Sequence, residues 1–275
     1  MRNLFAGSIL GAIAATAAAN AGVSYSTNFD LMGLGSIDGQ DGWDERNASY
    51  VATVSDATSA SGDRSFLQGA AFGSARMTFS PTLGSSAGES SAIGASLGFD
   101  AFNLSLRFRA ASLAADGSEV SFGASDASGN RAWSVTLRNE AGGVSVTGYG
   151  FDNEGAVVAP SFSVSGLARD EWQHMEILTN FREGEANDTV AYMLNGSTIA
   201  VGNTWEQWYR SSTESGTAWN RPYAVNRVAF RATASSAGAQ GFHFDDLTYT
   251  AVPAPGAVAL LAAAGLIASN RRRPA

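Results

Sequence analysis

The stretch Asn103-Leu104-Ser105-Leu106-Arg107-Phe108-Arg109 alternates apolar and polar side chains. Successive side chains of an extended strand point to opposite faces, so the leucines and the phenylalanine share one face while the serine and the arginines share the other. A strand with one apolar and one wet face is typical of antiparallel sheets that pack face to face. The stretch therefore predicts a half-buried strand of an all-β sandwich.

The same alternation recurs along the chain, at residues 119–122, 133–138, 144–146, 190–194, 228–231 and 242–249. Glycine-containing turns separate these stretches. The pair Asn195-Gly196, placed between two apolar runs, predicts a two-residue type I′ hairpin, because both positions of that turn need a positive φ. No long repeat or interior linker interrupts the pattern, so residues 22–251 are expected to form one domain, an antiparallel β-sandwich.

The composition excludes several classes of function. The 275-residue chain contains no cysteine, which rules out disulfides, thiolate zinc sites and a cysteine nucleophile. It contains no lysine either, and removing Arg2 and the three arginines near the C-terminus leaves 13 arginines against 25 acidic residues, a net charge of −12 for the body of the protein. Such a charge opposes binding to nucleic acid and to anionic lipid surfaces.

The N-terminus begins with Met1-Arg2-Asn3 and continues with an apolar run over residues 4–19, which is expected to form a short helix. A positive charge, a short apolar stretch and a small-residue exit define a secretory signal peptide. Ala19-Asn20-Ala21 fits the cleavage rule, so residues 1–21 are predicted to be a signal peptide and the exported protein to begin at Gly22. The run is short for an uncleaved membrane anchor.

The tail, residues 252–275, is predicted to be a second sorting segment. Pro253 and Pro255 interrupt the last strand, and a short apolar helix is expected over residues 257–268. Arg271, Arg272 and Arg273 follow, and arginines resist transfer across a bilayer. The apolar run is shorter than an ideal membrane span.

This order of proline motif, apolar helix and arginine cluster resembles the PEP-CTERM sorting signal of Gram-negative bacteria, with Ala254 where the family has glutamate. The resemblance implies that an exosortase-type membrane protease cuts near the motif after transient anchoring in the inner membrane. It also implies a place at the cell surface or outside the cell, in bacteria that secrete exopolysaccharide and build biofilms. The alternative is a plain tail anchor, and in both cases only the tail touches the membrane.

Three places in the body resemble the concanavalin A-like, laminin-G-like jelly-roll superfamily: residues 171–177, the hairpin at residues 190–201 and the closing strand at residues 244–249. In addition, Gly39-Gln40-Asp41-Gly42-Trp43 resembles an entry motif of exported jelly rolls. The resemblance implies a jelly-roll sandwich. The superfamily includes lectins, glycan-binding modules, glycosidases and adhesive domains, so the fold leaves the function open.

The sequence offers little for catalysis. Retaining glycosidases need two carboxylates about 5–5.5 Å apart, which two acids on one face of a strand commonly supply. The nearest approach, Asp152 and Glu154, lies in a glycine-rich turn, and His174 and His243 are interpreted as strand residues. We therefore expect that the protein is not an enzyme, with a glycosidase or polysaccharide lyase of the same fold as the alternative.

Calcium is the metal that this composition favours, because it accepts carboxylate and carbonyl oxygens in many arrangements. Asp245 and Asp246 alternate across the last strand, so one of them is expected to face inward or toward an edge, where a carboxylate needs a partner. The jelly-roll resemblance implies that an acid of the closing strand meets the N-terminal strand at a calcium ion, which makes Asp245 and Asp30 candidate ligands. The alternative is that Asp245 accepts hydrogen bonds from loop amides.

An aromatic cluster lies in a long segment between two expected strands. Aromatic faces beside arginine, asparagine and glutamine suit a sugar ring, which needs a flat apolar platform and planar hydrogen-bonding groups. The alternative is that the tryptophans pack the loop onto the sandwich. The candidate carbohydrate-binding residues are Trp205, Trp208, Tyr209, Arg210, Trp219, Arg221 and Tyr223.

These observations together predict an exported cell-surface or extracellular-matrix jelly roll. Its expected ligand is a secreted polysaccharide, held by the aromatic loop. A purely structural surface protein without a ligand is the remaining alternative.

Overall fold

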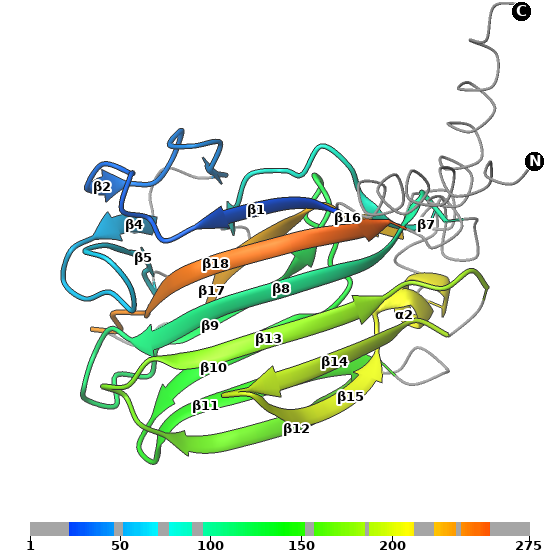
Figure 1. Ribbon diagram of the computed structural model, residues 1–275. Coiled ribbons are helices and arrows are strands. Elements are labelled where there is room, and N and C mark those ends of the chain that lie inside the picture. Colours follow the sequence, from blue (N-terminus) through cyan, green and yellow to red (C-terminus); the bar gives the residue numbers. More distant parts are fainter. Residues whose placement is uncertain are drawn as a thin grey trace, which may run out of the picture.

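The computed structural model describes residues 22–46, 52–70, 77–89, 96–151, 157–184, 187–211, 223–234 and 238–253. In this part of the chain two antiparallel sheets lie face to face and form a sandwich (Figure 1). The all-β, antiparallel sandwich expected from the alternating stretches is confirmed.

Sheet A is the larger of the two, and its strands run in the order β15-β14-β13-β8-β18-β5-β4-β2, with β1 paired to β18. Its strands are β1 (Val23–Thr27), β2 (Gly35–Ser36), β4 (Ala52–Ser55), β5 (Ser65–Gln68), β8 (Phe99–Ala110), β13 (Gln173–Asn180), β14 (Thr189–Leu194), β15 (Ser197–Asn203) and β18 (Phe242–Pro253). The long central strands β8 and β18 join the N-terminal, middle and C-terminal thirds of the domain.

Sheet B runs in the order β12-β11-β10-β9-β17-β6-β3. Its strands are β3 (Asp44–Glu45), β6 (Met77–Phe79), β9 (Glu119–Ser125), β10 (Ser134–Glu140), β11 (Gly143–Phe151), β12 (Val157–Leu167) and β17 (Arg227–Ala234). A separate ribbon pairs β7 (Ala87–Glu89) with β16 (Tyr223–Val225), and the helix α2 (Glu206–Ser211) follows β15.

The core between the sheets is rich in aromatic rings. Phe230 of β17 and Phe244 of β18 meet across the sandwich with ring centroids 4.9 Å apart, and Phe66 of β5 lies 5.2 Å from Phe230. Trp133, directly before β10, is fully buried and packs edge-on against Phe122 at 6.5 Å. Edge-on contacts of this kind are favourable. The core determines which side chains of each strand point outward, and the outward ones are the candidates for function.

The hairpin expected at Asn195-Gly196 is confirmed. Leu194 of β14 lies opposite Ser197 of β15, and the two residues between them have φ values of 51° and 77°. These values fit a type I′ turn. The Asn195 side chain also binds the adjacent strand, because its Oδ1 accepts a hydrogen bond from the backbone N–H of His174 at 2.8 Å.

β18 departs from regular alternation at Asp246. The pairing of β18 with β8 shifts register between Asp245 and Thr248, and Asp246 has a φ of 47°. This bulge inserts an extra residue. As a result neither aspartate faces the core, which receives Leu247 instead. One aspartate was expected to face inward or toward an edge; Asp245 is fully buried, but against the backbone N–H groups of Ala60 and Ser61 rather than in the core between the sheets.

The two ends add little to the described structure. Pro253 is the last residue of β18, so the strand passes residue 251, where the domain was expected to end. The predicted signal peptide, both predicted terminal helices, Pro255 and the arginines at residues 271–273 lie outside the described residues. Among the residues that are described, no helix has the length and apolar character needed to cross a membrane.

Candidate functional site

The outer face of sheet B, which is turned away from sheet A, has a floor of small hydroxyl-bearing side chains. Strand pairing places Ser121 of β9 opposite Thr136 of β10, and Thr136 opposite Thr147 of β11. Each of the three is at most 5% exposed, while the alternate residues Phe122 and Val135 lie in the core. Longer side chains can therefore lie across this face, above the hydroxyl groups.

Two arginines reach over this floor. Arg231 of β17 lies opposite Ser121, so it projects on the same face. Arg131 belongs to the connection between β9 and β10 and passes over Gly123. A methyl group on Gly123 would lie 3.3 Å from Arg131 Cδ and 2.2 Å from the carbonyl oxygen of Trp133. Glycine at position 123 is therefore what allows the segment that carries Arg131 to approach β9 so closely.

Part of the predicted aromatic cluster lies beside Arg131. The guanidinium carbon of Arg131 is 4.9 Å from the ring centroid of Trp205, a cation–π contact. Trp208 packs edge-on against Trp205 at 6.4 Å and against Tyr209 at 4.8 Å. The structure thus brings three of the predicted carbohydrate-binding residues together at the border of the outer face of sheet B.

Two of these aromatic residues also anchor the loop. Trp205 donates from Nε1 to the carbonyl oxygen of Tyr149 at 3.0 Å. The Tyr209 hydroxyl donates to the carbonyl oxygen of Arg131 at 3.1 Å and accepts from its N–H at 3.0 Å, and burial raises the pKa of Tyr209 to about 12. Trp205 and Tyr209 therefore hold the loop against the sandwich, as the alternative interpretation proposes. Trp208 is half-buried beside them.

The other predicted carbohydrate-binding residues are not placed by their side chains. Arg210 belongs to α2 and Tyr223 begins β16, and only their backbone is described. Trp219 and Arg221 lie outside the described residues. Sequence reasoning also missed the arginines of sheet B; alternation placed Arg231 on a wet face, but no local pattern indicates which distant residues share that face.

Arg138 extends the polar face along β10. It donates from Nε to Glu119 Oε2 at 2.6 Å and from Nη2 to the hydroxyl of Tyr149 at 3.1 Å. The hydrogen bond with Glu119 is the main reason that the pKa of Arg138 is raised. A hollow of about 350 Å³ adjoins this pair and is lined by Ala115, Gly117, Ser118, Asn139, Glu140 and Ala141.

The charges on this face are only partly compensated. Arg138 with Glu119 is the ion pair that the described residues form on the outer face of sheet B. Burial lowers the pKa of Arg131, and the positive charge of Arg231 lowers it further. Arg227 is nearly buried on the same strand as Arg231, where it contacts backbone carbonyl groups. Arg131 and Arg231 thus place two positive charges close together on the outer face of sheet B.

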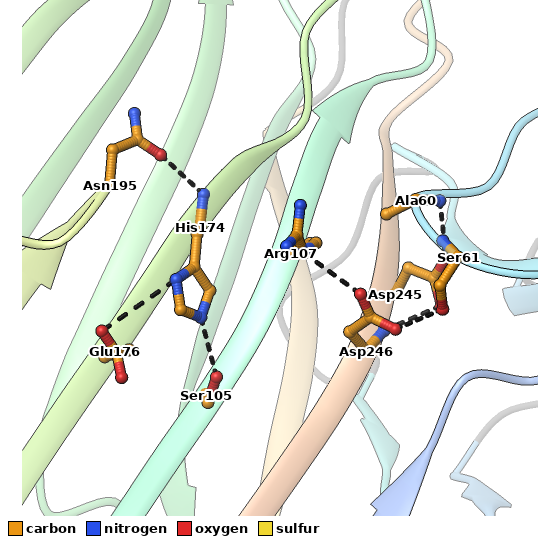
Figure 2. Close-up of polar contacts among 9 residues, drawn as sticks. All are labelled: Ala60, Ser61, Ser105, Arg107, His174, Glu176, Asn195, Asp245 and Asp246. Atoms are coloured by element: carbon orange, nitrogen blue, oxygen red, sulfur yellow. Dashed lines mark hydrogen bonds and ion pairs between the residues drawn. The ribbon is translucent and has the colours of Figure 1, made fainter.

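The outer face of sheet A carries a second polar cluster (Figure 2). His174 Nε2 lies 2.9 Å from Ser105 Oγ, His174 Nδ1 lies 4.0 Å from Glu176 Oε2, and Arg107 forms an ion pair with Asp246 at 3.1 Å. A serine hydrolase would need this order of groups together with oxyanion donors. Ser105 lies mid-strand between β13 and β18, so the backbone N–H groups around it are committed to the sheet. The cluster therefore serves to cross-link strands.

The candidate calcium ligands bind the loop between β4 and β5. Asp245 Oδ2 accepts hydrogen bonds from the backbone N–H groups of Ala60 at 2.7 Å and Ser61 at 3.1 Å (Figure 2). Asp30 Oδ1 accepts from the backbone N–H groups of residues 63 and 64 at 2.8 Å and 3.0 Å. These N–H dipoles would repel a cation, and no cluster of three metal-ligating side chains occurs among the described residues. The structure favours the loop-amide alternative over calcium.

His243 lies in β18 as expected from the sequence and is nearly buried at 5% exposure. Its Nδ1 is 3.0 Å from Ser65 Oγ. Burial, followed by the positive charge of Arg109, lowers the pKa of His243 to about 4. The folded protein thus holds this imidazole neutral over a pH range in which an exposed histidine takes up a proton.

We expect the free energy of unfolding to fall as the pH is lowered from about 6.5 to about 4. The unfolded chain takes up a proton at the ordinary histidine pKa, whereas the folded chain resists it, so acid favours the unfolded state. At about pH 5 the resistance of His243 to protonation lowers the free energy of unfolding by about 2 kcal/mol relative to neutral pH. Urea unfolding of the native protein and of His243→Gln over this range measures it; the same pH slope in both proteins would contradict the prediction.

No protein-family model matches this chain, and no curated protein matches it. Solved structures do share the fold. A sialidase has a TM-score of 0.49 and 10% identity over 84% of this chain, which spans only 19% of the sialidase chain. An alginate lyase in complex with alginate tetrasaccharide has a TM-score of 0.48 and 15% identity, over 84% of this chain and 98% of its own. A Bacillus licheniformis β-glucanase has a TM-score of 0.43 and 8% identity, over the same shares of the two chains.

The expectation that this protein is not an enzyme is corrected by these structures. A sialidase, an alginate lyase and a β-glucanase have similar folds, so the lack of a familiar carboxylate pair is no ground for excluding catalysis. Identities this low bear on the fold alone.

Proposed function

We propose that this protein binds a polysaccharide chain along the outer face of sheet B. The observation that carries the proposal is the position of Arg131, whose guanidinium group lies over the ring of Trp205 and beside a floor of hydroxyl groups. A sugar ring presents an apolar face to an aromatic side chain and hydroxyl groups to planar donors. Trp208 and Arg231 extend the same combination of aromatic and hydrogen-bonding groups.

The proposed place of action is outside the inner membrane. The sequences of the two ends support it: residues 1–21 have the pattern of a signal peptide, and residues 252–275 resemble a PEP-CTERM tail. We propose that an exosortase-type protease processes the tail and that the jelly roll meets its polysaccharide at the cell surface or in the extracellular matrix.

Replacing Trp208 with alanine is expected to weaken binding of the recognised polysaccharide about tenfold, because one aromatic contact to the sugar is lost. Isothermal titration calorimetry with a panel of polysaccharides, including those of the producing bacterium, measures the affinity. Leu178→Ala is the matched control, since Leu178 is 38% exposed on the outer face of sheet A. Equal weakening in both variants, or no polysaccharide bound by the native protein, would sink the proposal.

Cleavage of the bound chain is a second candidate, favoured by the position of Tyr149. Its hydroxyl is held by Arg138 Nη2 at 3.1 Å on the same face. A hydroxyl group placed beside a guanidinium group can exchange a proton with a reacting sugar. Incubating the protein with each polysaccharide that it binds tests this: new reducing ends alone indicate hydrolysis, new carbon–carbon double bonds indicate a lyase, and an unchanged chain length excludes both.

A further inference from the structure

We propose that the polysaccharide bound by this face is anionic, and that Arg131 and Arg231 bind its carboxylate or sulfate groups. This inference rests on the proposed function, because it names the class of ligand for the same face. It is supported by the hydrogen bonds and the charges found around the two guanidinium groups in the folded protein.

Arg231 has donors that the described residues leave unused. It projects from β17 between Met77 of β6 and Ser121 of β9. Its Nε is buried and has no hydrogen-bond partner within the described ranges. A guanidinium group carries five N–H donors, and a buried donor without an acceptor costs free energy. A negatively charged ligand group that contacts the guanidinium group of Arg231 would offer its N–H donors an acceptor.

The side chain of Arg131 also has few hydrogen-bond acceptors among the described residues. Its side chain donates one hydrogen bond, from Nη1 to Ser134 Oγ at 3.2 Å, and otherwise stacks on Trp205. The two hydrogen bonds between Tyr209 and Arg131 involve the backbone of Arg131. The charge of Arg231 is close enough to lower the pKa of Arg131, and among the described residues neither guanidinium group forms an ion pair with a carboxylate. Placing an anion there would relieve this repulsion.

The other arginines of sheet B already have partners. Arg138 is paired with Glu119. Arg227 donates to the carbonyl oxygens of residues 126 and 127, and Arg46 donates to those of residues 127 and 128. These last two arginines also lie over the ring of Phe79, at 3.8 Å and 5.0 Å from its centroid. Arg131 and Arg231 are therefore the pair on this face, among the described residues, that remains available to a ligand.

The chemistry of guanidinium groups identifies the ligand class. A guanidinium fork binds a carboxylate or a sulfate through two parallel hydrogen bonds, whereas a neutral sugar offers no charge to balance. The whole chain has a net charge of −8, so a polyanion is repelled by most of the surface. Binding of an acidic polysaccharide would therefore depend on the local positive charge of this face.

The test compares dextran, dextran sulfate and sodium polygalacturonate as ligands of the full chain, by isothermal titration calorimetry at low salt. We expect one of the two anionic polymers to bind at least about tenfold more tightly than dextran, and Arg231→Ala and Arg131→Ala each to lose about tenfold of that affinity. Arg107→Ala is the matched control: it removes the same charge from the outer face of sheet A, where Arg107 already pairs with Asp246. Its affinity should be unchanged.

Thermal unfolding first shows which variants fold. If Arg131→Ala does not fold, Arg231→Ala decides the question, because the Nε of Arg231 has no hydrogen-bond partner to lose among the described residues. Tight binding of dextran alone, lost in Trp208→Ala, would overturn the inference and keep the proposed function. Equal losses in Arg231→Ala and Arg107→Ala would overturn the inference by showing non-specific attraction. Binding of none of the three polymers would also overturn it, and the proposed function would fall with it only if the wider panel gives no ligand.

Discussion

Replacing Trp133 with alanine is expected to lower the free energy of unfolding by about 4 kcal/mol. The indole is fully buried between the sheets, edge-on to Phe122 at 6.5 Å and to Tyr192 at 6.4 Å. Its Nε1 donates to Thr179 Oγ1 at 2.8 Å, a bond that joins the two sheets. The substitution leaves a cavity and removes the hydrogen bond, and chemical denaturation measures the loss.

The control for this prediction is Trp133→Phe. It keeps an aromatic ring in the core and removes the N–H group, so a smaller loss of about 1–2 kcal/mol is expected. Because Trp133 follows Arg131 by two residues and its carbonyl oxygen lies against Gly123, the alanine variant should also loosen the proposed binding face. Equal losses in the two variants would mean that the ring does not fill the space between the sheets, contrary to the prediction.

Replacing Asp245 with alanine is expected to lower the free energy of unfolding by about 3 kcal/mol. The carboxylate is fully buried and accepts hydrogen bonds from the backbone N–H groups of Ala60, Ser61 and Asp246. Alanine leaves these donors without an acceptor. Burial raises the pKa of Asp245 while the same N–H groups oppose this, so part of the gain is offset by the cost of burying the charge.

The matched control is Asp63→Ala, which removes an exposed carboxylate from the same loop and should change stability by less than about 0.5 kcal/mol. Amide hydrogen exchange at residues 60 and 61 localises the effect, and it should accelerate only in the Asp245 variant. A calcium-dependent rise in Tm in the native protein that Asp245→Ala loses would restore calcium as the ligand. Similar stability losses in both variants would contradict the capping role of Asp245.

The local sequence pattern was sufficient to predict the alternating strands and the hairpin turn at Asn195-Gly196. The alternation at residues 103–109 lies within β8, and that at residues 242–249 lies within β18. A strand side chain is assigned to a face by its own position in the chain, so these predictions needed no partner strand. The exception is the bulge at Asp246, where one extra residue changes the alternation. The bulge could not be read from the sequence, because it depends on how β18 pairs with β8.

The candidate site was only half visible in the sequence. The aromatic residues at positions 205–209 stood out because they cluster along the chain, and the structure places them beside Arg131. Arg131 and Arg231 are separated by 100 residues and come close only through the pairing of β17 with β9. Similarly, the predicted calcium ligands Asp30 and Asp245 come from distant parts of the chain, and both accept hydrogen bonds from N–H groups of the loop between β4 and β5.

By itself the sequence determined the fold class, the inward and outward residues of the alternating stretches except at the bulge of Asp246, and the acidic, cysteine-free character of the chain. These properties follow from side-chain chemistry and from the two-residue period of a strand. Only the tertiary structure decided which outward face brings Arg131 and Arg231 together, and which carboxylates already accept hydrogen bonds from backbone amides. Strand order and register bring distant residues together, and in an antiparallel sandwich both are consequences of the packed core rather than of any local pattern.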